Sequence, residues 1–190
     1  MRPNPDSAST PETLRPVDSG AANHLGGMAM PSIQLSSTFG GLVDLSHQNS
    51  PRTVVCCYPM LALPEKPLPQ GWDRIPEERG WTPETCGFQE HYGELLALNA
   101  DVFGLSTQPP KDQDAVARRL HLPFEILSDA EFKLCDVLRL PTFEVNGMRL
   151  LEPLTLIIRG GRIEHVFYPV FPPNERADQV VRWLTAHPIS

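Results

Sequence analysis

The sequence lacks three features that would place it in common functional classes. It has no apolar run near the roughly 20 residues that a membrane-spanning helix needs, so we expect no membrane partner. Acidic residues outnumber basic ones, 23 against 16, which gives a net charge of −7. This balance argues against nucleic-acid binding, because phosphate recognition needs clustered Lys and Arg. The N-terminus also lacks the apolar core of a secretory signal.

Cysteine is scarce, with four residues at Cys56, Cys57, Cys86 and Cys135. No two form a Cys-x-x-Cys pair, and no paired histidines complete a zinc pattern. We therefore expect no metal and no other cofactor. One adjacent pair and two distant single cysteines do not resemble a disulfide framework, so the sequence predicts a reduced, cytoplasmic protein.

Proline, in contrast, is abundant, and the 21 prolines among 190 residues are about twice the average share. Residues 1–27 are rich in Pro, Ser, Ala, Asn and Gly and predict a flexible N-terminal tail. Residues 28–190 then form one domain, since the chain length is close to that of a single domain. Residues 59–80 hold five more prolines and predict a long loop, which is a frequent place for function.

Short apolar runs alternate with amphipathic segments through the domain. We expect strands at 32–36, 42–45, 52–58, 101–106, 123–128, 154–158 and 163–167, and helices from 82, at 111–120, at 129–138 and after an Asn174 cap. Alternating strands and helices predict an α/β fold with a mixed, mostly parallel central sheet and helices on both faces. The order matches an elaborated thioredoxin-like fold.

Cys86 is the cysteine best placed for reactivity. Thr82 is a good N-cap and Pro83 suits the first helical position, so Cys86 falls near a helix N-terminus, where the dipole lowers a thiol pKa. The alternative is that Cys86 is a small buried hydrophobic residue, as most free cysteines are. Cys56 and Cys57 face opposite sides of a strand and are expected in the core.

Several stretches resemble the peroxiredoxin family, and most of all its peroxiredoxin Q, or bacterioferritin comigratory protein, group. These stretches are Val-Val-Cys-Cys-Tyr-Pro at 54–59, Thr-Pro-Glu-Thr-Cys-Gly-Phe at 82–88, Val-Phe-Gly-Leu-Ser-Thr at 102–107, Leu-Pro-Phe-Glu-Ile-Leu-Ser-Asp at 122–129, and Gly-Arg-Ile-Glu-His-Val-Phe followed by Tyr-Pro-Val at 161–170. Together the resemblance covers about residues 28–187.

The resemblance implies a thiol-dependent peroxidase with a peroxiredoxin-type thioredoxin fold. In that family a peroxidatic cysteine reduces a peroxide, a resolving cysteine forms a disulfide with it, and a thioredoxin-like partner reduces the disulfide. Aligned on the family pattern, Cys86 takes the resolving position and Trp81 the peroxidatic one. Tyr58 and Pro59 fall at the strand end that borders the peroxide pocket.

The alignment also implies departures from the family pattern. Glu78 stands at the position of the family threonine, and Pro153 at that of the family arginine. Proline supplies neither charge nor hydrogen-bond donors. We therefore expect weak or altered peroxidase activity.

Two other interpretations stay open. In a shifted register Cys86 is itself the peroxidatic thiol, with a hydroxyl from Thr82 or Thr85 and charge from Arg79, Arg149 or Arg162. Alternatively, the fold is catalytically silent and binds a partner or small ligand in the former peroxide pocket.

Overall fold

Nine strands and four α-helices make up the part of the chain that the computed structural model describes, residues 17–63, 65–72, 87–170 and 172–190. The strands are β1 (Gln34–Ser37), β2 (Leu42–Asp44), β3 (Arg52–Cys57), β4 (Ala100–Ser106), β5 (Glu125–Ser128), β6 (Thr142–Val145), β7 (Met148–Leu151), β8 (Leu154–Arg159) and β9 (Arg162–Phe167). The helices are α2 (Tyr92–Ala97), α3 (Pro110–Leu120), α4 (Lys133–Leu138) and α5 (Arg176–Ala186), the last preceded by the 3-10 turn η3 (Pro173–Glu175).

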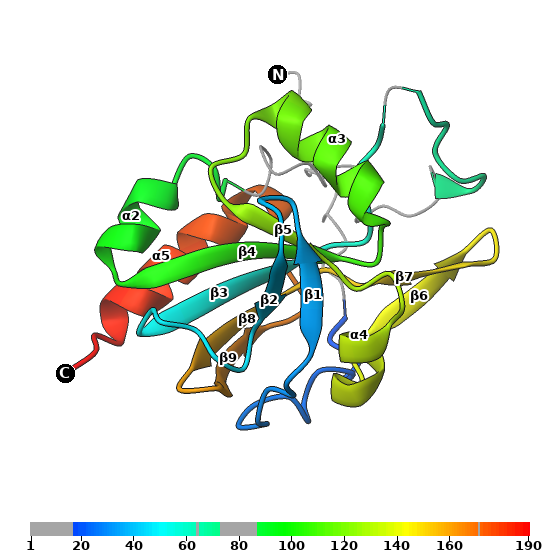
Figure 1. Cartoon of the computed structure of the whole chain (residues 1–190). Coiled ribbons are helices and arrows are strands. Elements are labelled where there is room, and N and C mark those ends of the chain that lie inside the picture. The colour runs from blue at the N-terminus through cyan, green and yellow to red at the C-terminus, as the bar shows by residue number, and fades with distance from the viewer. Residues whose placement is uncertain (1–16, 64, 73–86, 171) are drawn as a thin grey trace, which may run out of the picture.

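Seven of these strands form one sheet in the order β2-β1-β5-β4-β3-β8-β9 (Figure 1). The sheet is mixed, as expected, but it is not mostly parallel. Only the β3–β4 and β4–β5 pairs among these described strands are parallel, and the other four pairs are antiparallel. The excess of antiparallel pairs arises because β1 pairs antiparallel with β2 and β5, and β8 pairs antiparallel with β3 and β9.

The sequence interpretation missed the hairpin formed by β6 and β7, which stands outside the main sheet. Its turn is Asn146-Gly147, and both residues have positive φ, 49° and 74°. Asn-Gly between two extended runs is the strongest short-range signal for a two-residue hairpin. The sequence therefore contained the signal for this element.

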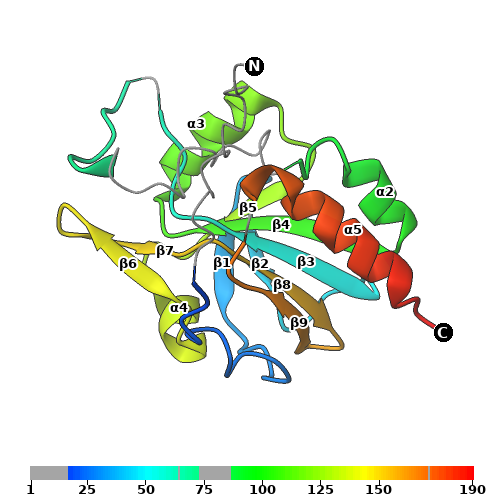
Figure 2. The same ribbon diagram turned by 180° about the vertical axis from the view of Figure 1, so that it is seen from behind.

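Two hydrophobic cores lie on the two faces of the sheet. Val54 and Cys56 of β3 join the core that contains α2, α3 and α5, whereas Val55 and Cys57 join the core that contains α4. This alternation follows from the two-residue period of a strand. Figures 1 and 2 show α2 and α5 together on one side of the sheet. Helix α4 contributes to the core on the other face, so the expectation of helices on both faces is confirmed.

Residues 17–27 pack on the domain, which corrects the boundary predicted for the flexible tail. Leu25 is fully buried and Ala22 is 6% exposed, both in the α4-side core. The Gly27 amide donates to the Ile163 carbonyl at 2.8 Å, and His24 Nε2 lies 2.8 Å from the Leu138 carbonyl oxygen. Compositional bias toward small and polar residues hid the two apolar side chains that anchor this segment. Residues 1–16 lie outside the described residues.

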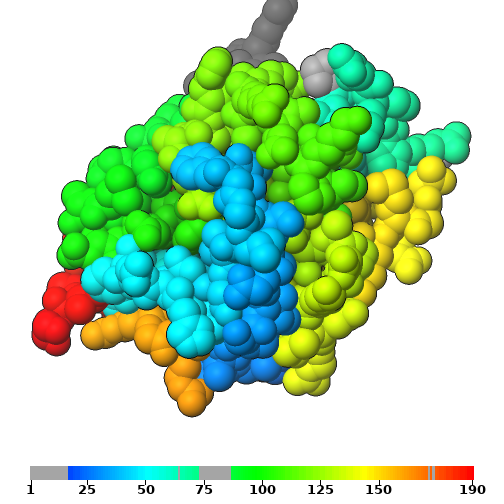
Figure 3. Space-filling model, in the orientation of Figure 1, coloured from blue at the N-terminus to red at the C-terminus, as the bar shows by residue number. Residues whose placement is uncertain are grey.

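The described part of the proline-rich loop after β3 is held by Trp72. This indole is 7% exposed and packs with Val145 of β6 and Leu150 of β7 in a third, small core. Figure 3 shows the loop and the hairpin side by side on the surface. The loop thus carries the chain away from the end of β3 and onto the hairpin.

Helix α5 runs antiparallel along β3 (Figure 2). Near the C-terminal end of α5, the Trp183 ring stacks between His165 and His187. Its centroid lies 4.7 Å from that of His165 and 4.2 Å from that of His187. Arg52 at the start of β3 donates to the His187 carbonyl at 2.5 Å and pairs with Glu164.

The expected Asn174 cap is wrong. The N-cap is Glu175, with no side-chain capping bond, because η3 leads directly into the helix.

Replacing Leu25 by Ala should lower the free energy of unfolding by about 2–5 kcal/mol, since it opens a cavity in the α4-side core. Urea denaturation followed by tryptophan fluorescence measures this. The matched control is Val17→Ala in the same segment, because Val17 is 88% exposed and its loss should cost less than about 0.5 kcal/mol. Equal, small effects for both variants would show that residues 17–27 do not stabilise the domain.

Candidate functional site

Three of the predicted site residues, Trp81, Thr82 and Cys86, lie outside the described residues. The other three, Tyr58, Pro59 and Pro153, are all buried. The site is therefore built from the strand ends around these three positions and from the side chains that reach them.

The structure brings Tyr58 and Pro153 to the same edge of the sheet. Cys57, the last residue of β3, is paired with Leu154, the first residue of β8. Tyr58 and Pro153 are the next residues beyond that pair on the two antiparallel strands. Two positions almost a hundred residues apart in sequence, predicted from the family pattern to border one pocket, thus meet at one edge.

Tyr58 is mainly a core residue at this edge. It is 6% exposed and belongs to the core beneath α2 and α5. A methyl group on Gly104 of the neighbouring strand would lie 3.4 Å from the Tyr58 ring. Gly104 and the Tyr58 ring are therefore packed closely together.

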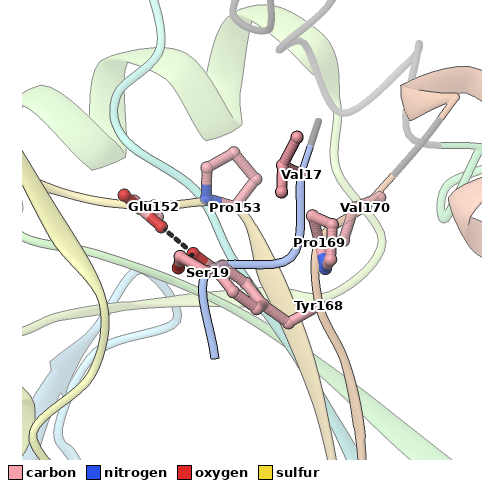
Figure 4. A pocket seen from close by; sticks show the side chains of 7 residues that line it. All are labelled: Val17, Ser19, Glu152, Pro153, Tyr168, Pro169 and Val170. Atoms are coloured by element: carbon pink, nitrogen blue, oxygen red, sulfur yellow. Dashed lines mark hydrogen bonds between the residues drawn. The ribbon is translucent and has the colours of Figure 1, made fainter. Parts of the chain in front are cut away.

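Pro153 lines a pocket of about 180 Å³, the Pro153 pocket. Figure 4 shows its walls, which are Val17, Ser19, Glu152, Pro153, Tyr168, Pro169 and Val170. The Tyr168 hydroxyl donates to the Glu152 carboxylate and lies 3.2 Å from the Ser19 hydroxyl. Burial and then the Glu152 carboxylate raise the pKa of Tyr168 to about 12. The phenol therefore stays protonated at neutral pH and acts as a hydrogen-bond donor.

A buried arginine completes this edge of the sheet. Arg176, the first residue of α5, is 1% exposed. Its Nη2 donates to the Cys57 carbonyl at 2.9 Å and to the Leu154 carbonyl, and its Nε donates to Thr155 Oγ1 at 2.6 Å. The guanidinium carbon lies 5.9 Å from the centroid of the Phe88 ring. We call this group, Arg176 with Cys57, Leu154, Thr155 and Phe88, the arginine cluster.

Sequence reasoning missed Arg176. It considered Arg149 and Arg162, which the structure places elsewhere: Arg149 pairs with Asp136 at 2.8 Å, and Arg162 donates to the Gly27 carbonyl at 3.2 Å. Arg79 lies outside the described residues. One signal was available, because a cation in the first turn of a helix opposes the helix dipole. Such a local conflict often marks a position selected for another reason.

The thiols of Cys56 and Cys57 are buried on the two faces of β3, as expected. Cys56 is 6% exposed and Cys57 is fully buried. Burial raises the pKa of the Cys57 thiol to about 12, although the Arg176 charge acts in the opposite direction. A neutral thiol in a core is unreactive toward peroxides.

Cys135 is a core residue of α4. It is fully buried, and burial raises the pKa of its thiol to about 11 against the lowering effect of Arg149. Arg149 Nη2 lies 3.6 Å from its sulfur. The backbone amides of Leu134 and Cys135 donate to the Asp129 carboxylate at 3.1 and 2.8 Å, which fixes the start of α4.

Within the described ranges, no three His, Cys, Asp or Glu side chains gather in a way that would hold a metal ion. In the same ranges, no helix has the length and apolar character to span a membrane.

Comparison with known proteins identifies relatives of the chain. Residues 78–166 match the sequence model of the AhpC/TSA family. Chloroplastic peroxiredoxin Q of Populus jackii is 25% identical over 158 residues, which are 83% of this chain and 67% of the relative. Chloroplastic peroxiredoxin Q of Sedum lineare is also 25% identical over 158 residues, 83% of this chain and 76% of the relative.

Solved structures share the fold. The peroxidoxin BcpB of Mycobacterium tuberculosis superposes with a TM-score of 0.67 at 20% identity, covering 86% of this chain and 98% of that one. Peroxiredoxin Q of Xanthomonas campestris superposes with a TM-score of 0.68 at 20% identity, covering 86% and 97%. The α/β thioredoxin-like fold of the peroxiredoxin type, expected from the sequence, is confirmed. In sequence the chain is therefore similar to AhpC/TSA proteins and to chloroplastic peroxiredoxin Q, and in fold it is similar to solved peroxiredoxin Q structures.

Proposed function

We propose that the protein is a thiol-dependent peroxidase of the peroxiredoxin type and that Cys86 is its reactive thiol. One observation carries this proposal: the other three cysteines are buried in the two cores of the sheet. Peroxide reduction needs an accessible thiolate. Cys86 is the cysteine that remains, and it lies inside the segment that matches the AhpC/TSA family.

The chemistry is a two-electron transfer from sulfur to oxygen. The Cys86 thiolate attacks one oxygen of the peroxide, the O–O bond breaks, and the thiolate becomes a sulfenic acid. The other oxygen leaves as an alkoxide or hydroxide and takes a proton from water. A thiol then condenses with the sulfenic acid, releasing water and forming a disulfide, and a second thiol reduces that disulfide.

The condensing thiol comes from outside the chain in this proposal. Trp81 occupies the position where the family pattern places a second cysteine, and an indole forms no disulfide. Cys57 and Cys135 are fully buried. A small thiol or a thioredoxin-like protein therefore supplies both reducing thiols. We further propose that turnover is slower than in the relatives, because Trp81 and Pro153 alter the pocket.

A second candidate function is ligand binding by a catalytically silent fold. The chemistry of the Pro153 pocket favours it, because its seven described wall residues include the Glu152 carboxylate and the Tyr168 donor but no Lys or Arg. Such walls suit a small neutral or cationic ligand better than an anionic one. Under this alternative Cys86 has no role, and the next experiments separate the two functions.

Alkylation with iodoacetamide at about pH 8 should label Cys86 in the native protein and leave Cys57 and Cys135 unlabelled. The reason is that thiols with pKa values of about 12 and 11 are almost entirely protonated at that pH, and their sulfurs are also inaccessible. Peptide mass spectrometry reads each site. All of the cysteines should be labelled in concentrated guanidinium chloride. Native labelling of Cys57 would contradict the burial argument.

Replacing Cys86 by Ser should abolish peroxide consumption supported by dithiothreitol or thioredoxin, down to the rate without protein. The wild-type protein should gain one oxygen at Cys86 when peroxide is added without a reductant, and intact-mass measurement detects it. Cys135→Ser is the matched control and should keep at least about half of the activity. A wild-type protein that shows no peroxide consumption would favour the ligand-binding alternative.

Replacing Trp81 by Cys should create an internal disulfide with Cys86 after one equivalent of peroxide, because the new thiol stands five residues earlier at the peroxidatic position. Loss of two free thiols in a dye-based thiol assay measures it. Trp81→Ser is the control, since it removes the indole without adding a sulfur. If Trp81→Cys keeps both thiols after oxidation, the alignment of Trp81 with the peroxidatic position is wrong.

A further inference from the structure

Two histidines and an arginine enclose the Trp183 ring near the C-terminal end of α5. The ring planes of His165 and His187 are inclined by only 17° and 16° to the indole, so the three rings are stacked. The guanidinium carbon of Arg52 lies 5.1 Å from the centroid of the same indole. Three side chains that can carry positive charge therefore share one aromatic ring. We call these four residues the Trp183 stack.

A bulge in β9 brings two neighbouring side chains to this cluster. The pairing of β9 with β8 shifts between Ile157 and Ile158, which leaves Glu164 as an extra residue in β9. An extra residue re-aims the side chains beside it. His165 therefore joins the Trp183 stack, and the adjacent Glu164 reaches Arg52 within it. In a regular strand, neighbouring side chains point to opposite faces of the sheet.

Arginines already occupy the Glu164 carboxylate. Its two oxygens accept hydrogen bonds from Nε and Nη2 of Arg52 at 2.7 and 2.8 Å, and Nη1 of Arg159 in β8 lies 3.6 Å from Oε1. Arg182, the residue before the stacked tryptophan in α5, is exposed. In the described part of the chain, no carboxylate pairs with the ring nitrogens of His165. A proton on His165 therefore has no counter-ion of its own.

The folded protein disfavours a proton on His165. Partial burial of the ring is the main cause and His187 the second, and together they lower the pKa of His165 against a smaller opposite effect of Glu164. In an unfolded chain the pKa of histidine is about 6.5. A group whose pKa is lower in the folded state stabilises the fold above that unfolded value, and the stabilisation is lost as the pH falls below it. Acidification below about pH 6.5 therefore weakens the contacts of His165.

We propose that the Trp183 stack is a pH-sensitive latch, which holds the C-terminal end of α5 on β3 and β9 at neutral pH and releases it on mild acidification. A protonated His165 faces His187 and the Arg52 guanidinium across one indole. Separation of the rings relieves this repulsion and returns the imidazolium to water. The attraction between a cation and the indole face opposes release, but up to three cations then compete for one ring. The latch is independent of the proposed function.

Release is confined to the residues after Leu184. That side chain is 2% exposed and belongs to the core between α5 and the sheet. Beyond it, the Trp183 stack and the hydrogen bond from Arg52 Nη1 to the His187 carbonyl join the helix end to the sheet. Figure 2 shows this end of α5 beside the start of β3. Its release uncovers one face of the indole and the Arg52 side chain, which is 2% exposed in the closed form.

The test is hydrogen exchange of the backbone amides at residues 185–190 in the full chain, read by mass spectrometry between pH 7.5 and pH 5.5. Each rate is corrected for the exchange rate of an unstructured peptide at the same pH. Protection of these amides in the wild type should fall by about three- to tenfold on acidification, because one unit of pKa difference is a factor of ten. Protection of the amides in β3 should stay constant, since the central strand does not open.

His165→Phe keeps an aromatic ring on the indole and removes the titrating nitrogens. Its protection at residues 185–190 should be the same at both pH values. His47→Phe is the matched control, because His47 is 81% exposed and its contacts are with Asp44 and Ser46. This control should keep the wild-type loss of protection on acidification.

Three outcomes overturn the latch. The first is wild-type protection that is constant or that rises on acidification, which would show that cation–π attraction outweighs repulsion. The second is a loss of protection that persists in His165→Phe, since another group then senses the pH. The third is an equal loss in β3, which shows general unfolding. If His165→Phe does not fold, His165→Gln decides by the same criterion, because its amide does not titrate either.

Discussion

The hydrogen bonds from Arg176 to the ends of β3 and β8 join the parts of the molecule on which the rest depends. They attach the start of α5 to the edge where the central strands stop. That edge is also where the proline-rich loop leaves the sheet and where the chain returns at Gly87. A single buried cation thus links the sheet, the last helix and the segment after Cys86. Its charge needs ordered dipoles around it, because solvent cannot reach it.

The two ends of β3 use buried arginines differently. At its start, Arg52 pairs with the Glu164 carboxylate, and the side-chain hydrogen bond from Arg52 is the main reason that the pKa of Glu164 is lowered. That arrangement neutralises charge and anchors the end of α5 beside the Trp183 stack. At the other end, the described contacts of Arg176 are to carbonyls, a hydroxyl and an aromatic ring. The first arrangement anchors the end of α5 at the start of β3, and the second ties the start of α5 to the ends of β3 and β8.

The hydrophobic cores explain why four cysteines amount to one candidate thiol. The two-residue period of β3 directs Cys56 and Cys57 into opposite cores, and α4 directs Cys135 into the core beside Cys57. Burial suppresses ionisation of a thiol, since the thiolate loses its hydration. Even the nearby charges of Arg176 and Arg149 do not reverse this effect at Cys57 and Cys135. The packing of the sheet therefore keeps the thiols of Cys56, Cys57 and Cys135 buried, away from dissolved oxidants.

Local patterns in the sequence determined much of this architecture. Apolar runs located β3, β4, β5 and β8, alternation placed the adjacent cysteines on two faces, and ordered motifs indicated the peroxiredoxin fold. The Asn146-Gly147 turn was also readable, although its hairpin was missed. These features depend on neighbours within a few residues, which is why a sequence reveals them.

Tertiary structure decided the rest, because the deciding contacts join distant residues. Leu25 is buried because its segment packs on the domain, where Gly27 contacts the Ile163 carbonyl and His24 contacts the Leu138 carbonyl. The composition of the segment does not indicate these contacts. The antiparallel pairing of β8 with β3 joins two strands that are far apart in sequence. Arg176 reaches the site from 119 residues beyond Cys57. No local pattern shows that a guanidinium at the start of the last helix ends beside Pro153, since only the packing of α5 along β3 places it there.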